Sequence, residues 1–301
     1  MKDKNVIKKV LVPIDGSDLS FQAKKTAAII AKNIGATVTV LYVIHDVEQY
    51  YDALSVAVQG MEYYIPQSAI NEIRDIRKKE AKKVINEAQN FFKEEGVSVK
   101  SKILMGFDEA DIIIEFSKNN YDLIIMGAHG NNEKSPYELG SITKKAIRHT
   151  ICPILFTKKA CTLSKLLVCL DGSKNSINTL DYAVKLAEKA HSKLTLLNIQ
   201  EVPSYGHLSP DAQSIFEKVG TQIIANSLDA VGKKGLEATK RVEFGIVANR
   251  IVEIAEKEDH DLIVLGHKGL GIVQRFLLGS VSDKVSHKAK CSVLIFPSKH
   301  E

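Results

Sequence analysis

Two glycine-rich segments of this chain have the residue types and the spacing of a phosphate-binding loop. The first reads Gly127-Ala-His-Gly130 and is followed, after nine residues, by Gly140-Ser141. The second reads Gly266-His-Lys-Gly269 and is followed, after nine residues, by Gly279-Ser280. Glycine lets backbone N–H groups come close to an anion, and a helix that begins at the Gly-Ser pair adds unpaired N–H donors and a favourable dipole. The spacing therefore predicts a nucleotide-binding protein with one or two sites.

The residues around the glycines predict the elements that position them. Asp122–Met126 and Asp261–Leu265 read as buried strands, each ending at the first glycine of its motif. Continuous apolar strands that alternate with helices indicate a parallel sheet covered on both faces, so the fold class is α/β, doubly wound and Rossmann-like. Ligands of such sheets bind at the carboxyl ends of the strands. Asp15, Val43 and Gly127 follow three of the predicted strands and are expected to meet in one crevice.

Two helices of the first copy have clear sequence limits. The pattern over Ser20–Asn33 is helical, with Ser17 or Asp18 as its N-cap and Gly35 just after its end. A longer amphipathic helix is predicted over Ser68–Glu95. Its apolar face is expected to consist of Ile70, Ile73, Ile76, Val84, Ala88 and Phe91.

The whole chain is a duplication. Leu11-Val-Pro-Ile-Asp15-Gly-Ser17 reappears as Leu167-Val-Cys-Leu-Asp171-Gly-Ser173 at an offset of 156 residues, whereas the glycine motifs repeat at an offset of 139. The difference places 17 extra residues in the first copy, around a tyrosine-rich segment at residues 45–66. This segment either covers exposed core or forms a lid or partner surface. We expect two tandem domains, residues 1–159 and 160–301, of ordinary domain size.

Composition limits the compartment and the partners. No segment has the ~20 apolar residues needed to cross a bilayer, and the first residues lack the apolar stretch of a secretory signal. The four cysteines show no metal-ligand spacing. The net charge of +5 comes with lysines on solvated helix faces, without the aromatic residues that accompany nucleic-acid-binding lysines. We therefore expect a cytoplasmic protein with no metal site and with neither nucleic acid nor membrane as a partner.

The double G-x-x-G-(nine)-G-S motif, placed after a D-L-I-x-x-G strand and with V-P-x-D-G-S near the chain start, resembles the universal stress protein family. The resemblance covers essentially all 301 residues, as two fused copies of that domain. It implies an adenine nucleotide (ATP, AMP or ADP) as the ligand, with or without Mg²⁺ or Mn²⁺. The first-strand aspartate and a backbone group after the second strand would hold the adenosine, and the glycine loop and helix start would hold the phosphates. For site one the implied residues are Pro13, Asp15, Val43, Gly127, His129, Gly130, Gly140, Ser141, Ile142 and Thr143. For site two they are Asp171, Ile199, Gly266, His267, Lys268, Gly269, Gly279, Ser280, Val281 and Ser282.

These residues also have structural interpretations. The first-strand aspartates can simply cap the following helices, and the motif glycines can simply end strands. Ser141 and Ser280 fit helix N-caps with or without a ligand. His129 and His267 are interpreted as equivalent loop residues, and a loop histidine is usually solvated rather than catalytic.

The two glycine loops differ in charge. The first carries Glu133 and Glu138 near the expected phosphates, where carboxylates repel a triphosphate unless a cation bridges them. The second carries Lys268 and Arg275 instead. Site two is therefore expected to be occupied more readily than site one.

No catalytic residue is predicted. The P-loop pattern G-x-x-x-x-G-K-[ST] is absent, as are S-G-G-x-D-S, H-x-G-H, G-x-S-x-G and zinc motifs. We expect a nucleotide-dependent stress or regulatory switch, in which the ligand orders the glycine loop and changes a surface, with at most slow ATP hydrolysis. The alternatives are an ATP-consuming ATPase or phosphotransferase, and a nucleotide-independent interaction or chaperone-like module.

The last strand of each copy predicts how the copies associate. Pro153–Thr157 and Ser292–Pro297 are apolar and are expected at a sheet edge, where an unpaired strand recruits a partner. In the resembled family this edge mediates dimers, so the two copies are expected to pair within the chain. The tandem is further expected to form a homodimer. The sequence identifies no other protein partner.

Overall fold

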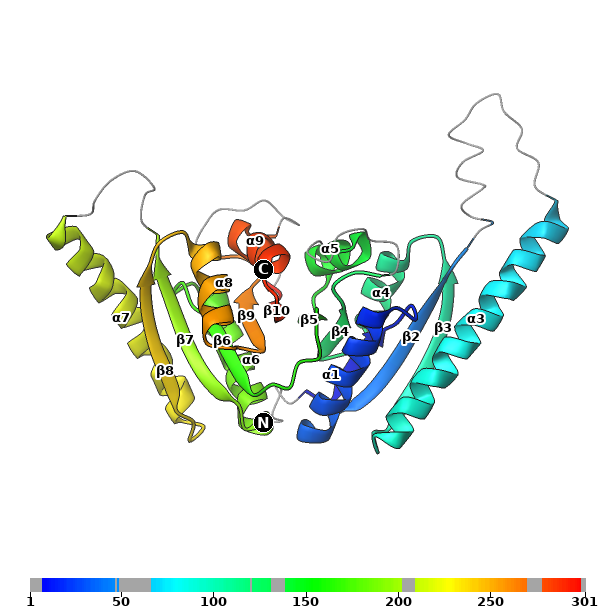
Figure 1. The fold of residues 1–301 in the computed structure, drawn as a ribbon, viewed down its shortest axis with the longest axis horizontal. Coiled ribbons are helices and arrows are strands. Elements are labelled where there is room, and N and C mark those ends of the chain that lie inside the picture. Colours follow the sequence, from blue (N-terminus) through cyan, green and yellow to red (C-terminus); the bar gives the residue numbers. More distant parts are fainter. Residues whose placement is uncertain are drawn as a thin grey trace, which may run out of the picture.

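The computed structural model describes residues 7–46, 48, 66–119, 121–130, 139–201, 209–269 and 278–298. Within these ranges, strands and helices alternate in both copies (Figure 1). The first copy contains β1 (Lys9–Pro13), α1 (Asp18–Ile34), β2 (Thr37–His45), α3 (Gln67–Glu94), β3 (Val99–Gly106), α4 (Glu109–Ser117), β4 (Leu123–Gly127), α5 (Ser141–His149) and β5 (Ile154–Thr157). The second contains β6 (Lys165–Cys169), α6 (Lys174–Ala190), β7 (Lys193–Gln200), α7 (Pro210–Gly232), β8 (Ala238–Phe244), α8 (Val247–Lys257), β9 (Leu262–Gly266), α9 (Ser280–Lys288) and β10 (Ser292–Phe296).

One continuous sheet crosses both copies, in the strand order β3-β2-β1-β4-β5-β10-β9-β6-β7-β8. Among the described strands, pairs within a copy are parallel, and the β5–β10 pair that joins the copies is antiparallel. In each copy the strand order reverses beside the first strand, because β1 lies between β2 and β4, and β6 lies between β7 and β9. The α/β, doubly wound fold class predicted from the sequence is confirmed.

The sheet separates two apolar cores. One core lies under α1, α3, α6 and α7 and includes Phe92 and Leu180. The other lies under α4, α5, α8 and α9 and includes Ile147 and Val285. Both cores contain residues of both copies, so apolar contact continues across the β5–β10 junction.

Local chemistry explains where the first helix of each copy begins. The Ser17 hydroxyl accepts a hydrogen bond from the Ser20 N–H at 3.2 Å, and Ser173 does the same for Ser176 at 3.1 Å. These bonds satisfy backbone donors at the helix start that have no partner within the helix. Helix α1 ends at Gly35, whose φ of 69° is in the left-handed region that favours glycine. The predictions of Ser17 and Gly35 as helix ends are confirmed.

Helix α3 differs from its predicted apolar face at one position. The side chain of Ile76 is 58% exposed, whereas the sequence pattern predicts it on that face. The buried stripe of the helix contains Ala81 and Ile85. At about 100° per residue, five residues turn a helix by about 500°, which places Ile76 on the opposite side from Ala81. The position that continues the stripe toward the helix start is Arg77, four residues before Ala81.

The two copies contact each other through more than the strand ladder. Leu155 of β5 lies opposite Leu294 of β10, so the two strand edges predicted from the sequence pair with each other. The Tyr182 hydroxyl of α6 donates to the Asp122 carbonyl oxygen at 3.1 Å. At the equivalent position of α1, the Thr26 hydroxyl accepts a bond at 3.0 Å from the N–H of Cys161, in the segment between the copies.

Candidate nucleotide-binding sites

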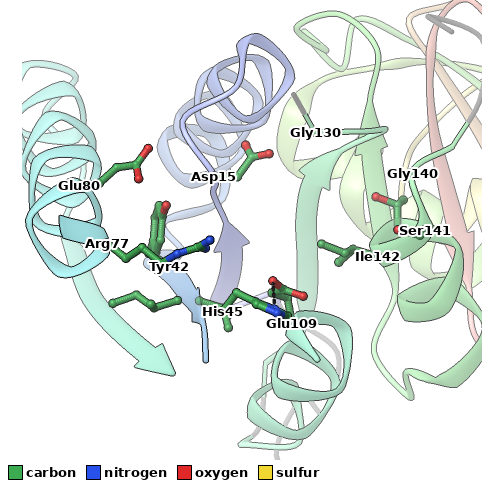
Figure 2. Close-up of a pocket in the computed structure, with 13 residues that line it drawn as sticks. Asp15, Tyr42, His45, Arg77, Glu80, Glu109, Gly130, Gly140, Ser141 and Ile142 are labelled. Carbon is green, nitrogen blue, oxygen red and sulfur yellow. Dashed lines mark hydrogen bonds and ion pairs between the residues drawn. The ribbon is translucent and has the colours of Figure 1, made fainter. Parts of the chain in front are cut away.

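Site one lies where β1, β2 and β4 end, next to the reversal of strand order. The site consists of two adjoining hollows, of about 360 and 100 Å³. Both hollows are lined by Asp15, Val43, Gly130 and Thr143. Figure 2 shows that the larger hollow is bordered by α3 on one side and by the start of α5 on the other. The smaller hollow is lined mainly by apolar residues. Site one therefore has an apolar slot that opens into a polar chamber.

The aspartate after β1 is held by the turn that follows it. One oxygen of Asp15 accepts a hydrogen bond from the Ser17 N–H at 2.9 Å. The other oxygen faces Gly130, where a Cβ atom would lie only 2.5 Å from it. Asp171 and Gly269 repeat this arrangement in the second copy, with an even closer approach. A side chain at the second glycine of either motif would therefore have to displace the carboxylate. Because Ser17 and Ser173 cap the helices, the carboxylates themselves do not.

The helices after the glycine loops begin at glycine, so the prediction that Ser141 and Ser280 are N-caps is wrong. Gly140 and Gly279 occupy the N-cap positions of α5 and α9, and as glycines they supply no capping side chain of their own. The serines are instead the first helical residues. N–H groups at an uncapped helix start are suited to an anion, with the helix dipole adding to the attraction.

A side-chain bond fixes each helix start to its loop. The Thr143 hydroxyl donates to the Gly127 carbonyl oxygen at 3.0 Å, and the Ser282 hydroxyl donates to Gly266 at 2.7 Å. Both hydroxyl residues are buried. In this structure the two hydroxyl groups position the helix relative to the loop. The family resemblance implies that Thr143 and Ser282 belong to the site, but it does not say whether they contact phosphate or hold the helix in place.

Site two is one cavity of about 490 Å³ at the ends of β6, β7 and β9. Its apolar walls come from Leu197, Ile199, Val247 and Ile251, and its loop contributes Lys268. The carboxyl groups that line it are Asp171 and Glu201. The second copy therefore repeats the cavity of the first with a different set of wall residues.

The structure brings almost all of the implied site residues together. All ten residues implied for site one line its two hollows, and nine of the ten implied for site two line its cavity. The exception is His267, which does not correspond to His129. The Gly140 N–H binds the Ala128 carbonyl, and the Gly279 N–H binds the His267 carbonyl. His267 is thus the counterpart of Ala128, and Lys268 is the counterpart of His129. Counting from the first glycine of each motif would have given this result.

Several lining residues were missed by the sequence interpretation. In the larger hollow of site one the polar residues among them are Tyr42, His45, Arg77, Glu80 and Glu109. His45 Nδ1 lies 3.1 Å from Glu109 Oε1 across the chamber wall. Burial raises the pKa of the Tyr42 phenol, and the nearby Glu80 and Asp15 carboxylates raise it further. Their strand-end and helix positions carry no motif, so only the fold shows that they face the cavity.

Other residues named in the sequence predictions lie outside the described ranges. The acidic residues Glu133 and Glu138, the basic Arg275 and the tyrosines of the 45–66 segment all lie in segments whose structure is not described. Within the described ranges, no group of three or more His, Cys, Asp or Glu side chains is arranged to hold a metal ion. Nor does any described helix have the length and apolar character needed to cross a membrane.

Comparison with known proteins agrees with this geometry. The model of the universal stress protein family matches residues 7–158 and 162–297. Universal stress protein YxiE of Bacillus subtilis is 32% identical over 146 residues, which are 44% of this chain and 97% of YxiE. Universal stress protein Slr1230 of Synechocystis is 26% identical over 301 residues, covering 96% of this chain and 100% of Slr1230. The crystal structure of a universal stress protein from Archaeoglobus fulgidus is similar with a TM-score of 0.70 at 22% identity, over 95% of this chain and 97% of that one. The chain therefore belongs to the universal stress protein family, with two copies of the family domain in tandem.

Proposed function

We propose that this protein binds adenine nucleotides, ATP or AMP, at sites one and two and acts as a nucleotide-dependent stress or regulatory switch. The observation that carries the proposal is the twice-repeated arrangement of an aspartate carboxylate, a glycine that contacts it and an uncapped helix start around one cavity. The cavities, at about 360 and 490 Å³, are of a size that suits small-molecule ligands.

Each part of a nucleotide has a matching surface in this proposal. The apolar slot beside Val43 or Ile199 would take the base, the carboxylate of Asp15 or Asp171 would accept from ribose hydroxyls, and the helix start would take phosphate. Any Mg²⁺ or Mn²⁺ would arrive with the nucleotide and be held mainly by its phosphates. Binding would order the glycine loop against the helix start, and a protein partner would recognise the changed surface.

The same proposal assigns no dedicated catalysis to the protein. An ATPase or phosphotransferase is the alternative, because a bound triphosphate can be reached by water. A second alternative is an interaction module that works without nucleotide. Native mass spectrometry of the full chain, with and without ATP and Mg²⁺, separates these functions. The switch function predicts one or two intact adenine nucleotides per chain and a melting temperature that rises with ligand concentration. Rapid release of ADP would favour the enzyme, and bare protein at millimolar ATP would leave only the interaction module.

The assembly of the protein and its cellular location are also proposals. We propose a cytoplasmic protein whose domains divide near residue 159 and whose tandem chains form a homodimer. Because β5 and β10 pair with each other, that homodimer needs a different surface. Light scattering of the purified chain tests the assembly, and a monomer at all concentrations would contradict it.

A further inference from the structure

The base slot of site one contains a carboxyl group that has no counterpart at the same position of site two. Glu109, the first residue of α4, lines both hollows of site one. In the second copy the equivalent helix, α8, begins at Val247, which lines site two. The two residues correspond, because each lies four residues before an isoleucine, Ile113 or Ile251, that lines the same cavity. This wall is therefore charged in the first copy and apolar in the second.

The Glu109 carboxylate is held at the slot by its neighbours. His45, the last residue of β2, brings its Nδ1 to 3.1 Å from Glu109 Oε1. The Phe107 ring packs against the imidazole, with ring centroids 5.8 Å apart. Figure 2 shows the His45–Glu109 pair at the wall of the chamber, separate from Asp15. Because the Glu109 side chain is only 30% exposed and has a fixed neighbour, its oxygens can distinguish one ligand atom from another.

The other acceptors of the slot already have partners or another task in the proposed complex. Asp15 accepts from the Ser17 N–H at 2.9 Å and is assigned to the ribose hydroxyls. The Ser20 hydroxyl donates to the Ser17 carbonyl oxygen at 2.9 Å, and the Thr143 hydroxyl donates to a carbonyl of the glycine loop. Among the described residues that line the slot, Glu109 is thus the negatively charged acceptor that is left for the base.

A base that enters this slot must satisfy the carboxylate that it covers. An ionised carboxylate accepts hydrogen bonds and donates none. Adenine presents the N–H donors of its 6-amino group, whereas unsubstituted purine has no donor at that position and hypoxanthine has a carbonyl oxygen there. A base without the donor leaves a desolvated charge unpaired, which costs free energy. Sites built to hydrogen-bond a ligand N–H therefore reject analogues that lack it.

We propose that Glu109 is the residue that selects the 6-amino group of adenine in site one. Site two lacks this selection, because Val247 takes the place of Glu109. The residue of site two at the sequence position of His45 is Glu201, which is exposed, so water rather than a base satisfies its carboxylate. The two copies therefore differ in how strictly they recognise the base. This inference rests on the proposed nucleotide function.

The test measures the affinities of three nucleotides for the full chain by calorimetry, in a Gly269→Ala background that weakens site two. The probes are ATP, the triphosphate of purine riboside, which lacks the 6-amino group, and ITP, which has an oxygen in its place. ATP should bind about tenfold more tightly than either analogue, as expected for a hydrogen bond to a charged group. Glu109→Val should bring the three affinities to within about twofold of one another. Ratios are compared because removing a carboxylate also reduces the repulsion of every triphosphate.

Two further variants separate hydrogen bonding from effects on the helix. Glu109→Gln keeps the shape of the side chain and adds an amide N–H that can donate to the oxygen of hypoxanthine. It should therefore strengthen ITP binding relative to ATP binding. Glu115→Gln is the matched control, because it makes the same change on the exposed face of α4, where Glu115 pairs with Lys118. It should leave every affinity ratio unchanged.

Site two supplies an internal comparison. In a Gly130→Ala background, which weakens site one, ATP and the triphosphate of purine riboside should bind within about twofold of each other. Equal affinities in site one, or a preference for ATP that survives Glu109→Val or is the same in both sites, overturns the role of Glu109 while nucleotide binding still stands. If the unsubstituted chain binds none of the three nucleotides at millimolar concentration, the proposed function fails and this inference fails with it.

Discussion

Lys158, the first residue after β5, donates to the carbonyl oxygen of Ala289, which follows α9 of the other copy, at 2.7 Å. The same ammonium donates to the His287 carbonyl oxygen at 2.9 Å. These carbonyls end the helix whose first residue, Ser280, lines site two. The second copy cannot make the equivalent bonds to α5, because the counterpart of Lys158 after β10 is Pro297, which has no side-chain donor. The end of the first copy thus holds the C-terminal end of α9 in the second.

Truncating this side chain should destabilise the junction between the copies. Lys158→Met keeps the apolar stem and removes both donors, and we expect a loss of about 1–3 kcal/mol in the free energy of unfolding. Urea denaturation followed by circular dichroism measures it. Lys159→Met is the control, since the Lys159 side chain is exposed. Equal stability of the two variants would show that the carbonyl contacts contribute nothing net.

The glycines that face the carboxylates should be the most sensitive positions for ligand binding. A methyl group at Gly269 or Gly130 would overlap the site aspartate, so alanine there should raise the dissociation constant of the affected site at least about tenfold. Native mass spectrometry should show one nucleotide fewer for either variant and none for the double variant. Gly232→Ala is the control, because nothing lies within 4 Å of the added methyl group. Unchanged stoichiometry in the double variant would contradict the role of the glycine–aspartate contact in nucleotide binding.

His260 should make the second copy less stable in acid. Its imidazole is buried and lies 3.0 Å from the Thr195 hydroxyl. Burial lowers its pKa from the usual 6.5, and the Lys165 ammonium lowers it further. The unfolded chain therefore binds a proton more readily than the folded chain, so stability decreases as the pH falls below about 6.5. His260→Gln keeps a hydrogen-bonding group without this titration and should lose less stability between pH 8 and pH 5.

The matched control for that pH series is an exposed histidine. His191 ends α6 with a φ of 53°, so His191→Asn retains a residue that tolerates this conformation. Its stability should follow the parent protein at each pH. Identical pH dependence of the parent and His260→Gln would show that another group causes the acid sensitivity.

Each half of the chain should self-associate when it is produced alone. In residues 1–159 the β5 edge would lose the β10 ladder in which Leu155 lies opposite Leu294. A bare apolar edge recruits another strand, so we expect a homodimer in analytical ultracentrifugation. Mixing this half with residues 160–301 should give a one-to-one complex. A stable monomeric half would mean that the β5–β10 junction is not needed to cover either edge.

The sequence was sufficient for the parts of the fold that repeat. The spacing from Gly127 to Gly140 recurs in the second copy, and strand ends before each motif placed the aspartate, the loop and the helix start together. Parallel α/β sheets bring such ends to one edge whatever the rest of the chain does. For this reason, residues far apart in sequence could be assigned to one cavity.

The remaining details depend on rotation and on contacts between copies. Apolar character placed Ile76 on the buried face of α3, but its side chain is exposed, because a helix turns each residue by about 100° and Ile76 faces away from the buried stripe. Lys158 and Tyr182 reach across the junction, and no local pattern marks a residue whose partner lies in the other copy. The sequence predicts Ser141 rather than Gly140 as the N-cap, because a serine side chain commonly accepts a hydrogen bond from the first turn of a helix.

The shared apolar cores have a consequence for how the protein responds to heat. Since Phe92 and Leu180 belong to one core, and Ile147 and Val285 to the other, the interior of each half continues into that of the other half. The chain should therefore melt in one cooperative calorimetric transition. A nucleotide held in one half would then protect the other half from unfolding as well, so occupancy of a single site would set the lifetime of the entire molecule.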